Sequence, residues 1–270
     1  MLEKIKATAK FIKEKIKAEP EFGIILGTGL GGLVNEIEIL ESIPYGEIPN
    51  FPVSTVEGHS GRLIYGKLGN KNVLAMQGRF HYYEGYSMNE VAFPVRVFKY
   101  IGVSHLFVSN ASGGLNPDFK VGDIVIISDH INFFPEHPLR GKNLNELGPR
   151  FPDMGKTYDE HLRNKAKQIA HEYGINLKEG VYVGVSGPTF ETLAEYKMFR
   201  IFGGDMVGMS TVPEVIAARH MDMNVFGISI ITDSGVPGEI TEISHEKVQE
   251  VAMNAEPNMT LVMKKLIESI

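Results

Sequence analysis

The sequence contains no cysteine, no long apolar run and no excess of basic residues, and each absence excludes a class of protein. Without cysteine among its 270 residues, the chain cannot form disulfides, use a catalytic thiol or bind a metal through thiolates. No stretch approaches the roughly 18 consecutive apolar residues of a membrane span. The formal net charge of −6 argues against a nucleic-acid-binding surface. We therefore expect no membrane and no nucleic-acid partner, and an anionic ligand would need local positive groups.

Residues Met1 to Lys17 carry apolar side chains at helical spacing among lysines and acids. A signal peptide needs a continuous apolar core, so this segment predicts an amphipathic surface helix, and we expect a cytoplasmic protein. The hydrophobic share of 43% and the charged share of 22% are typical of a globular protein. Because no linker-like segment divides the chain, residues 1–270 are predicted to form a single domain.

Short apolar runs bounded by glycine alternate with helical patterns, which predicts an α/β sheet flanked by helices. Several runs are apolar at successive positions, as in strands covered on both faces. The predicted strands are 23–26, 72–76, 105–109, 123–128, 181–185, 205–209 and 225–232, with a further strand-like run at 36–41. The predicted helices are 89–101, 159–173, 192–202, 213–220 and 245–270, the last kinked or restarted at Pro257. Residues 132–154, interrupted by prolines, predict a functional loop or contact surface.

A cation, an imidazole and a phenol follow the second of these strands: Arg79, His81 and Tyr83. Ligands bind at strand ends in α/β sheets, because loops there bring polar groups together without interrupting the core. The cluster suits an anionic substrate. Five further glycine-containing turns couple small polar or charged residues to apolar runs, at 27–32, 56–61, 110–114, 187–192 and 208–214. Together they indicate one site.

The sequence does not fit two common nucleotide-binding motifs or a metal site. Gly27, Gly29 and Gly32 match the dinucleotide fingerprint, but a strand-like run follows too soon for the crossover helix that the fingerprint requires. This turn instead suits a small anion. A P-loop lysine is absent from it. His130 and His137 have no third ligand at metal-binding spacing, so no metal is expected.

Three long motifs resemble those of the purine nucleoside phosphorylases, specifically the trimeric class that prefers 6-oxopurines. They are MQGRFH with YEGY at 76–86, GPTFE at 187–191 and VGMSTVPE at 207–214, and the resemblance runs from the N-terminal to the C-terminal helix. It implies a single α/β domain with a mixed, barrel-like sheet. The implied reaction is phosphorolysis of purine ribonucleosides and 2'-deoxyribonucleosides to the free base and (deoxy)ribose 1-phosphate, as in purine salvage. It implies no cofactor, since inorganic phosphate is a co-substrate.

The resemblance also assigns roles to residues. The implied phosphate-binding residues are Thr28, His59, Arg79, His81, Ser210 and the backbone at Ala111. The ribose would meet Tyr83, Met209 and His245, and the base would lie against Ala111, Phe190 and Val207, facing Glu191 and Asp233. His81, Glu191 and Asp233 are the implied catalytic residues. Phe151 matches an aromatic that the family lends to a neighbouring subunit, which implies a homotrimer.

Asp233 departs from the family pattern, in which asparagine commonly occupies this position and both donates to O6 and accepts from N7–H. An ionised aspartate cannot donate, but it accepts from a 6-amino group, so the exclusion of adenosine is relaxed. Glu191 favours 6-oxopurines, because a carboxylate accepts from N1–H. Read without the family, Glu191 also fits a helix-dipole partner and Asp233 a turn or N-cap residue. Base preference stays open.

The sequence therefore predicts a phosphorylase for inosine and guanosine, with adenosine left open. The alternative is a 5'-methylthioadenosine or adenosine phosphorylase, which shares the fold but needs an apolar wall where His245 should meet the ribose 5'-hydroxyl. A more distant alternative is a non-catalytic nucleoside-binding protein. The phosphate-binding set argues against it, because binding a nucleoside alone does not require Arg79, His59 and Ser210.

Overall fold

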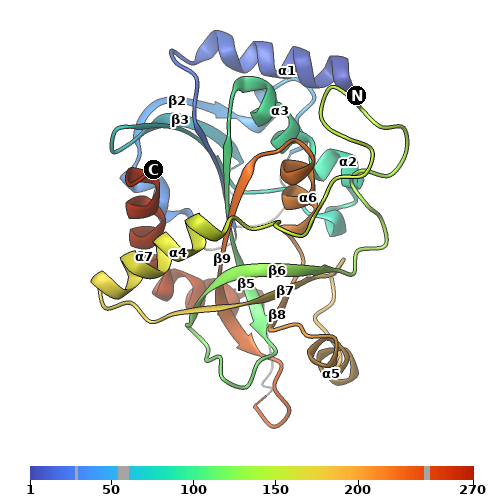
Figure 1. Cartoon of the computed structure of the whole chain (residues 1–270), viewed down its shortest axis with the longest axis vertical. Helices are drawn as coiled ribbons and strands as arrows, with labels where there is room; N and C mark the ends of the chain where they lie inside the picture. The colour runs from blue at the N-terminus through green and yellow to red at the C-terminus, as the bar shows by residue number, and fades with distance from the viewer. Residues whose placement is uncertain (28–29, 54–60, 240–243) are drawn as a thin grey trace.

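A nine-stranded mixed sheet organises the computed structural model, which describes residues 1–27, 30–53, 61–239 and 244–270 (Figure 1). Along the sheet the strands run in the order β2-β3-β4-β1-β5-β8-β7-β6-β9. Strand β9 also pairs with β5, so five strands from β5 to β9 close into a ring and the other four extend from it. The strands are β1 (Phe22–Leu26), β2 (Glu38–Pro44), β3 (Arg62–Leu68), β4 (Lys71–Gln77), β5 (His105–Gly114), β6 (Ile124–Asn132), β7 (Leu177–Gly184), β8 (Met206–Gly208) and β9 (Asn224–Ser234).

The sheet contains both parallel and antiparallel pairs. Strand β1 is parallel to both β4 and β5, and β5 is parallel to β9. Strand β8 is antiparallel to β5 but parallel to β7, and β6 is antiparallel to β9. The predicted fold class, an α/β fold with a mixed, barrel-like sheet and flanking helices, is confirmed.

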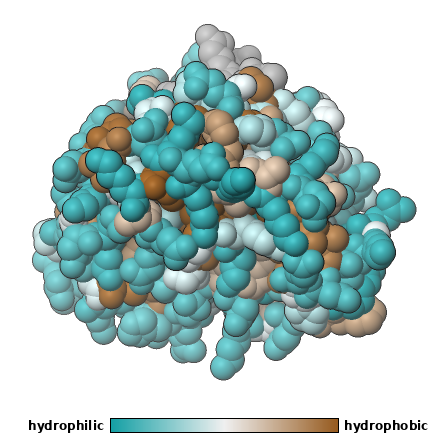
Figure 2. Space-filling view, turned by 90° about the horizontal axis from the view of Figure 1, so that it is seen from above, coloured by the Kyte–Doolittle hydropathy of each residue, from teal (hydrophilic) through white to brown (hydrophobic). Residues whose placement is uncertain are grey.

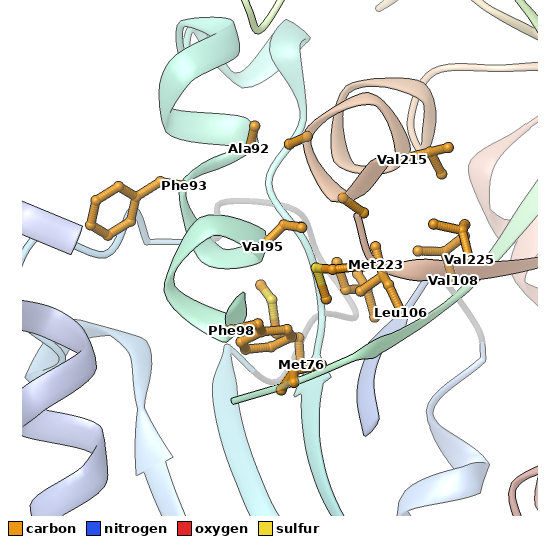
Figure 3. Packing of buried hydrophobic residues seen from close by; sticks show 14 of the residues in the cluster. Met76, Ala92, Phe93, Val95, Phe98, Leu106, Val108, Val215, Met223 and Val225 are labelled. Atoms are coloured by element: carbon orange, nitrogen blue, oxygen red, sulfur yellow. The ribbon is translucent and has the colours of Figure 1, made fainter. Parts of the chain in front are cut away.

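Helices cover both faces of the sheet. The seven α-helices of the described residues are α1 (Leu2–Lys15), α2 (Met88–Val91), α3 (Phe93–Ile101), α4 (Glu160–Glu172), α5 (Leu193–Ile201), α6 (Val212–His220) and α7 (His245–Glu268). One hydrophobic core joins α1, α3 and α6 to the sheet, and a second joins α4 and α7 to it. In Figure 3, Val95 and Phe98 of α3 point toward Met76 of β4 and Leu106 of β5. Gly23 permits this packing, because a Cβ there would lie 2.6 Å from the Phe98 ring.

The N-terminal helix is amphipathic, as predicted from the sequence. Helix α1 buries Ile5, Ala9 and Ile12, while its lysines remain outside. The face seen from the α1 side is mainly hydrophilic (Figure 2). No helix among the described residues is both long and apolar enough to cross a membrane.

The structure corrects three sequence-based expectations. The predicted helix 89–101 is two helices, broken at Ala92, because Pro94 has no N–H to continue the helical ladder. Helix α7 does not restart at Pro257: one helix runs through it, because both halves bury apolar residues. Strand β3 was not predicted, since its charged ends and Gly66 obscure the apolar run. Gly66 is needed where β3 passes β2, because a Cβ there would lie 2.4 Å from the Glu38 carbonyl oxygen.

The predicted irregular segment contains neither helix nor strand after β6 ends at Asn132. It is nevertheless fastened to the helices beneath it. Arg96 of α3 donates to the Pro138 carbonyl at 2.6 Å, and the His220 ring of α6 lies 3.0 Å from the Pro149 carbonyl oxygen. Buried side chains therefore fix the course of this segment.

Candidate active site

A cavity of about 510 Å³ opens where β5, β8 and β9 end, a size typical of small-molecule sites. Eleven of the predicted site residues line it: Arg79, His81, Tyr83, Ala111, Phe190, Glu191, Val207, Met209, Ser210, Asp233 and His245. They come from segments far apart in the sequence, as predicted for a shared strand-end site. Thr28 and His59 lie outside the described residues. Phe151 is absent from the lining and is 88% exposed.

Arg79 provides a buried cation at one end of the cavity. Its side chain is 1% exposed, and its Nε donates to Glu214 Oε1 of α6 at 3.1 Å. Its Nη1 donates to the Ser109 carbonyl oxygen at 2.8 Å and to Ser210 Oγ at 3.2 Å. A buried charge needs such partners, and they leave the guanidinium little rotational freedom. This end of the cavity is therefore preorganised for an anion.

His81 lies beside the same end. Glu84 Oε1 accepts from the His81 backbone N–H at 2.8 Å and lies 3.0 Å from His81 Nδ1. The imidazole stacks on Tyr83 with ring centroids 4.7 Å apart. Burial lowers the pKa of His81, although the hydrogen bond that its ring donates to Glu84 opposes that shift. A neutral ring that donates Nδ1–H to Glu84 presents Nε2 as an acceptor, which suits the protonated oxygen of a phosphate monoanion.

Two carboxyl groups lie among the cavity-lining residues on the strand β9 and α5 side. Burial, with a smaller contribution from the charge of Asp233, raises the pKa of Glu191 to about 7. Burial also raises the pKa of Asp233, against a hydrogen bond of 3.0 Å from the Thr232 hydroxyl. Gly113 makes room for this group, since a Cβ there would lie 2.7 Å from Asp233 Oδ2. Near neutral pH, the pair can therefore both donate and accept hydrogen bonds.

The alternative interpretations, Glu191 as a helix-dipole partner and Asp233 as a turn or N-cap residue, are wrong. Glu191 precedes helix α5, whose N-cap is Thr192 and whose capping-box acid is Glu195, so Glu191 is not a first-turn residue. Asp233 belongs to β9 and pairs with Gly113 of β5 rather than capping a helix. Helix capping therefore accounts for neither acid, and both line the cavity.

The rest of the lining includes less polar residues. Tyr83, Met209, Phe190 and Val207 contribute to it, and His245 joins from the first residue of α7. Met209 fits because Gly187, at φ 60°, has no side chain: a Cβ there would lie 2.4 Å from the Met209 sulfur. Such a wall suits the flat, apolar faces of a sugar and a base.

The sequence assigned no individual role to eight further residues that line the cavity: Glu84, Asn110, Ser112, Gly113, Pro188, Gly208, Thr232 and Val248. Five of them lie in the glycine-containing turns at 110–114, 187–192 and 208–214 that were predicted to form the site. Glu84 could have been identified from the sequence, because it stands three residues after His81, at capping-box spacing. Asn110, Ser112 and Thr232 are polar residues inside apolar strands. That anomaly also could have marked them.

Comparison with known proteins identifies the family. Residues 21–268 match the Phosphorylase superfamily. Purine nucleoside phosphorylase 1 of Geobacillus stearothermophilus is 50% identical over 266 residues, which are 98% of this chain and 97% of that protein. The purine nucleoside phosphorylase of Rattus norvegicus is 47% identical over 270 residues, covering 97% of this chain and 93% of that protein.

Solved structures agree with the sequence comparison. The crystal structure of Schistosoma mansoni purine nucleoside phosphorylase in complex with adenosine superimposes with a TM-score of 0.95, at 43% identity, and covers 100% of this chain and 98% of that one. A schistosoma purine nucleoside phosphorylase in complex with hypoxanthine gives a TM-score of 0.94 at the same identity and coverage. The chain therefore belongs to the phosphorylase superfamily, with relatives named purine nucleoside phosphorylase along its whole length.

Proposed function

We propose that this chain is a purine nucleoside phosphorylase, a pentosyltransferase that converts purine ribonucleosides and 2'-deoxyribonucleosides into the free base and (deoxy)ribose 1-phosphate. One observation carries the proposal: a single cavity holds a buried Arg79 with Ser210 at one end and the carboxyls of Glu191 and Asp233 on another wall. An attacking anion and a purine leaving group need such an arrangement. The names of the full-length relatives support the same reaction.

The residues fit the steps of the reaction. Phosphate held by Arg79, Ser210 and His81 attacks C1' of the sugar while the bond from C1' to N9 breaks and its electron pair moves to the purine. Charge on the base is then stabilised by a hydrogen bond that strengthens in the transition state. Asp233, whose pKa is raised by burial, can hold the proton that such a bond to N7 requires. Glu191 binds the N1 edge.

No organic cofactor or metal is part of this proposal, and inorganic phosphate is the co-substrate. We assign Thr28 and His59 to phosphate, and Ala111 to both phosphate and base, from the family motifs. Tyr83, Met209 and His245 are assigned to the ribose. We further propose that the active species is a cytoplasmic homotrimer in which Phe151 completes a neighbouring site. The exposure of Phe151 supports this assignment.

A phosphate-dependence assay tests the reaction class. Inosine, guanosine, adenosine and 5'-methylthioadenosine are each incubated with the protein, with and without phosphate, and base and sugar phosphate are measured. We expect base release from inosine only with phosphate. Equal release without phosphate would indicate a hydrolase, and binding without turnover would indicate a nucleoside-binding protein. Preference for methylthioadenosine would favour the alternative phosphorylase, which His245 argues against because its ring is polar.

Arg79→Ala tests the anion site. The variant removes one partner of a buried charge pair, which costs about 2–5 kcal/mol of transition-state stabilisation. Steady-state kinetics should show the loss mainly in kcat/KM for phosphate. An unchanged phosphate dependence would remove Arg79 from the site.

A further inference from the structure

Thr211 adopts a rare backbone conformation directly after Ser210. Its φ is 72° and its ψ is −52°, and the Val212 N–H donates to the Ser210 carbonyl oxygen at 2.7 Å. This is a γ-turn with positive φ, a strained conformation that is especially unfavourable for a β-branched residue. Thr211 is fully buried. Such strain persists only where the surroundings hold it, so the contacts of its side chain matter.

A chain of buried hydrogen bonds reaches Thr211 from the sheet. Asn110 Nδ2 lies 2.9 Å from Thr211 Oγ1, and Asn110 Oδ1 lies 2.6 Å from Ser229 Oγ. Ser229 Oγ is in turn 2.6 Å from Ser112 Oγ. A separation of 2.6 Å suits an O–H···O bond and 2.9 Å suits N–H···O, so the two distances fix which end of the Asn110 amide faces which neighbour.

This amide orientation sets the direction of the hydroxyl hydrogens. Thr211 Oγ1 accepts from Asn110, and among the described residues the other hydrogen-bond partner of this hydroxyl is Ser210 Oγ at 3.0 Å. Since Asn110 Nδ2 can only donate, Ser210 Oγ is the acceptor that remains for the Thr211 hydrogen. Ser210 Oγ also accepts from Arg79 Nη1 at 3.2 Å. Both acceptor positions of the Ser210 oxygen are then occupied. Its own hydrogen must be donated elsewhere.

Two acceptors compete for that hydrogen. One is the Tyr182 hydroxyl, which accepts from the Ser210 backbone N–H at 3.3 Å and whose pKa is raised to about 12 by burial. That phenol is neutral, and an anion in the cavity is the stronger acceptor because hydrogen bonds to charged groups are about twice as strong as neutral ones. Ser210 lines the cavity beside Arg79.

We propose that Asn110 and Thr211 are positioning residues that turn the Ser210 hydroxyl hydrogen toward the bound phosphate. The inference rests on the proposed phosphate site, and it explains why the Ser210 hydroxyl donates its hydrogen to the bound phosphate. The buried hydroxyls of Ser112 and Ser229 hold the amide of Asn110, and successive hydrogen bonds of one direction polarise one another.

Four variants test the proposal. Thr211→Val keeps the branched shape but removes the donor to Ser210, and Asn110→Asp replaces the amide by a group that only accepts, so that Thr211 donates to residue 110 instead of to Ser210. Both should raise KM for phosphate by about tenfold or more, the loss of one hydrogen bond to a charged group, and leave KM for inosine within about twofold. Thr211→Ser should restore phosphate KM to near the wild-type value. Thr8→Val is the matched control, since Thr8 is equally buried but bonds to backbone carbonyls in α1 and at Pro49.

A double-mutant cycle separates positioning from packing. If Thr211 acts through Ser210, Thr211→Val should have less than about a twofold further effect on phosphate KM in a Ser210→Ala background. Equal effects on both KM values, or additive effects of the two substitutions, would overturn the proposal. Calorimetric binding of inorganic phosphate to each folded variant gives the same comparison without turnover. Inactive wild-type protein that still binds phosphate would contradict the proposed function rather than this inference.

Discussion

Under the proposed function, Glu191 and Asp233 face the base, and the two common kinds of purine present opposite hydrogen-bonding edges to them. Adenine has a donor at its 6-amino group and an acceptor at N1, whereas hypoxanthine has an acceptor at O6 and a donor at N1. In the proposed placement, a proton on Glu191 suits adenine and its loss suits hypoxanthine, while a protonated Asp233 donates to N7 or O6 and accepts from a 6-amino group through its other oxygen. Since burial raises the pKa of both groups, protonation of the pair would let one site bind both bases.

Substrate preference should therefore depend on pH. The pKa of Glu191 is raised to about 7, so Glu191 is protonated below that pH and ionised above it. Ionisation removes the donor to adenine N1 and creates an acceptor for N1–H of hypoxanthine. Between about pH 6 and about pH 8, the ratio of kcat/KM for adenosine to that for inosine should fall at least about fivefold.

Glu191→Gln is the control for this measurement. A glutamine amide offers a donor and an acceptor at every pH, so the ratio should become flat. A ratio that is independent of pH in the unmodified enzyme would mean that Glu191 does not titrate against the base.

The identity of residue 233 should also set the preference. Adenosine should be a measurable substrate, and Asp233→Asn should move the ratio toward inosine, because asparagine donates to O6 but faces the adenine amino group with another donor. A mismatch of this kind costs about 1–3 kcal/mol, or roughly 5- to 150-fold. Kinetics with both substrates on both enzymes measure it. An unchanged ratio would exclude a direct contact between Asp233 and the base edge.

At the scale of the element, the pairing of β5 with β9 controls where Asp233 lies. The register shifts between Ser112 and Gly113, beside the Asp233 partner. Gly113→Ala would place a methyl group 2.7 Å from Asp233 Oδ2, so the carboxyl must move. We expect a higher KM for nucleosides and an unchanged KM for phosphate. Gly46→Ala is the matched control, because a Cβ there meets nothing within 4 Å; equal effects of both substitutions would contradict the argument.

The sequence predicted the helices and strands whose apolar residues are regularly spaced. It missed a strand that is defined by its hydrogen bonds to neighbouring strands. Strand β4 and helix α4 were found because their apolar spacing is regular, whereas β3 is defined by hydrogen bonds to β2 and β4. The site residues followed from long motifs at strand ends. The hydrogen-bonded chain through Asn110 and Thr211 could not be predicted, because it joins residues 101 positions apart through side-chain orientation alone.

At the scale of the whole molecule, the segment that carries Phe151 has features of an interface. Phe151 is 88% exposed although Arg96 and His220 fasten the segment at two carbonyl groups. Exposed apolar side chains also gather around α5, among them Leu193, Ile201 and Phe202. Large apolar patches on a protein surface commonly mark contacts with another protein. A homotrimer would cover such surfaces.

Mixed assemblies should therefore recover activity that each parent lacks. In the proposed trimer, a site needs Arg79 from one subunit and Phe151 from its neighbour. One parent carries Phe151→Ala. The other carries Arg79→Ala with Glu214→Gln, which removes the buried carboxylate that Arg79 would otherwise leave unpaired. Each parent alone should be impaired in every site.

Co-expression with two affinity tags yields the mixed enzyme, and light scattering gives its size. In a cyclic trimer that carries both tags, one of the three sites contains both intact residues, so activity should reach about a third of that of the unmodified enzyme. This recovery requires that Phe151 act across an interface, because no exchange of subunits can repair a site built within one chain. An active monomer, full activity of Phe151→Ala alone, or mixed assemblies no more active than their parents would each show that the site is complete in a single chain.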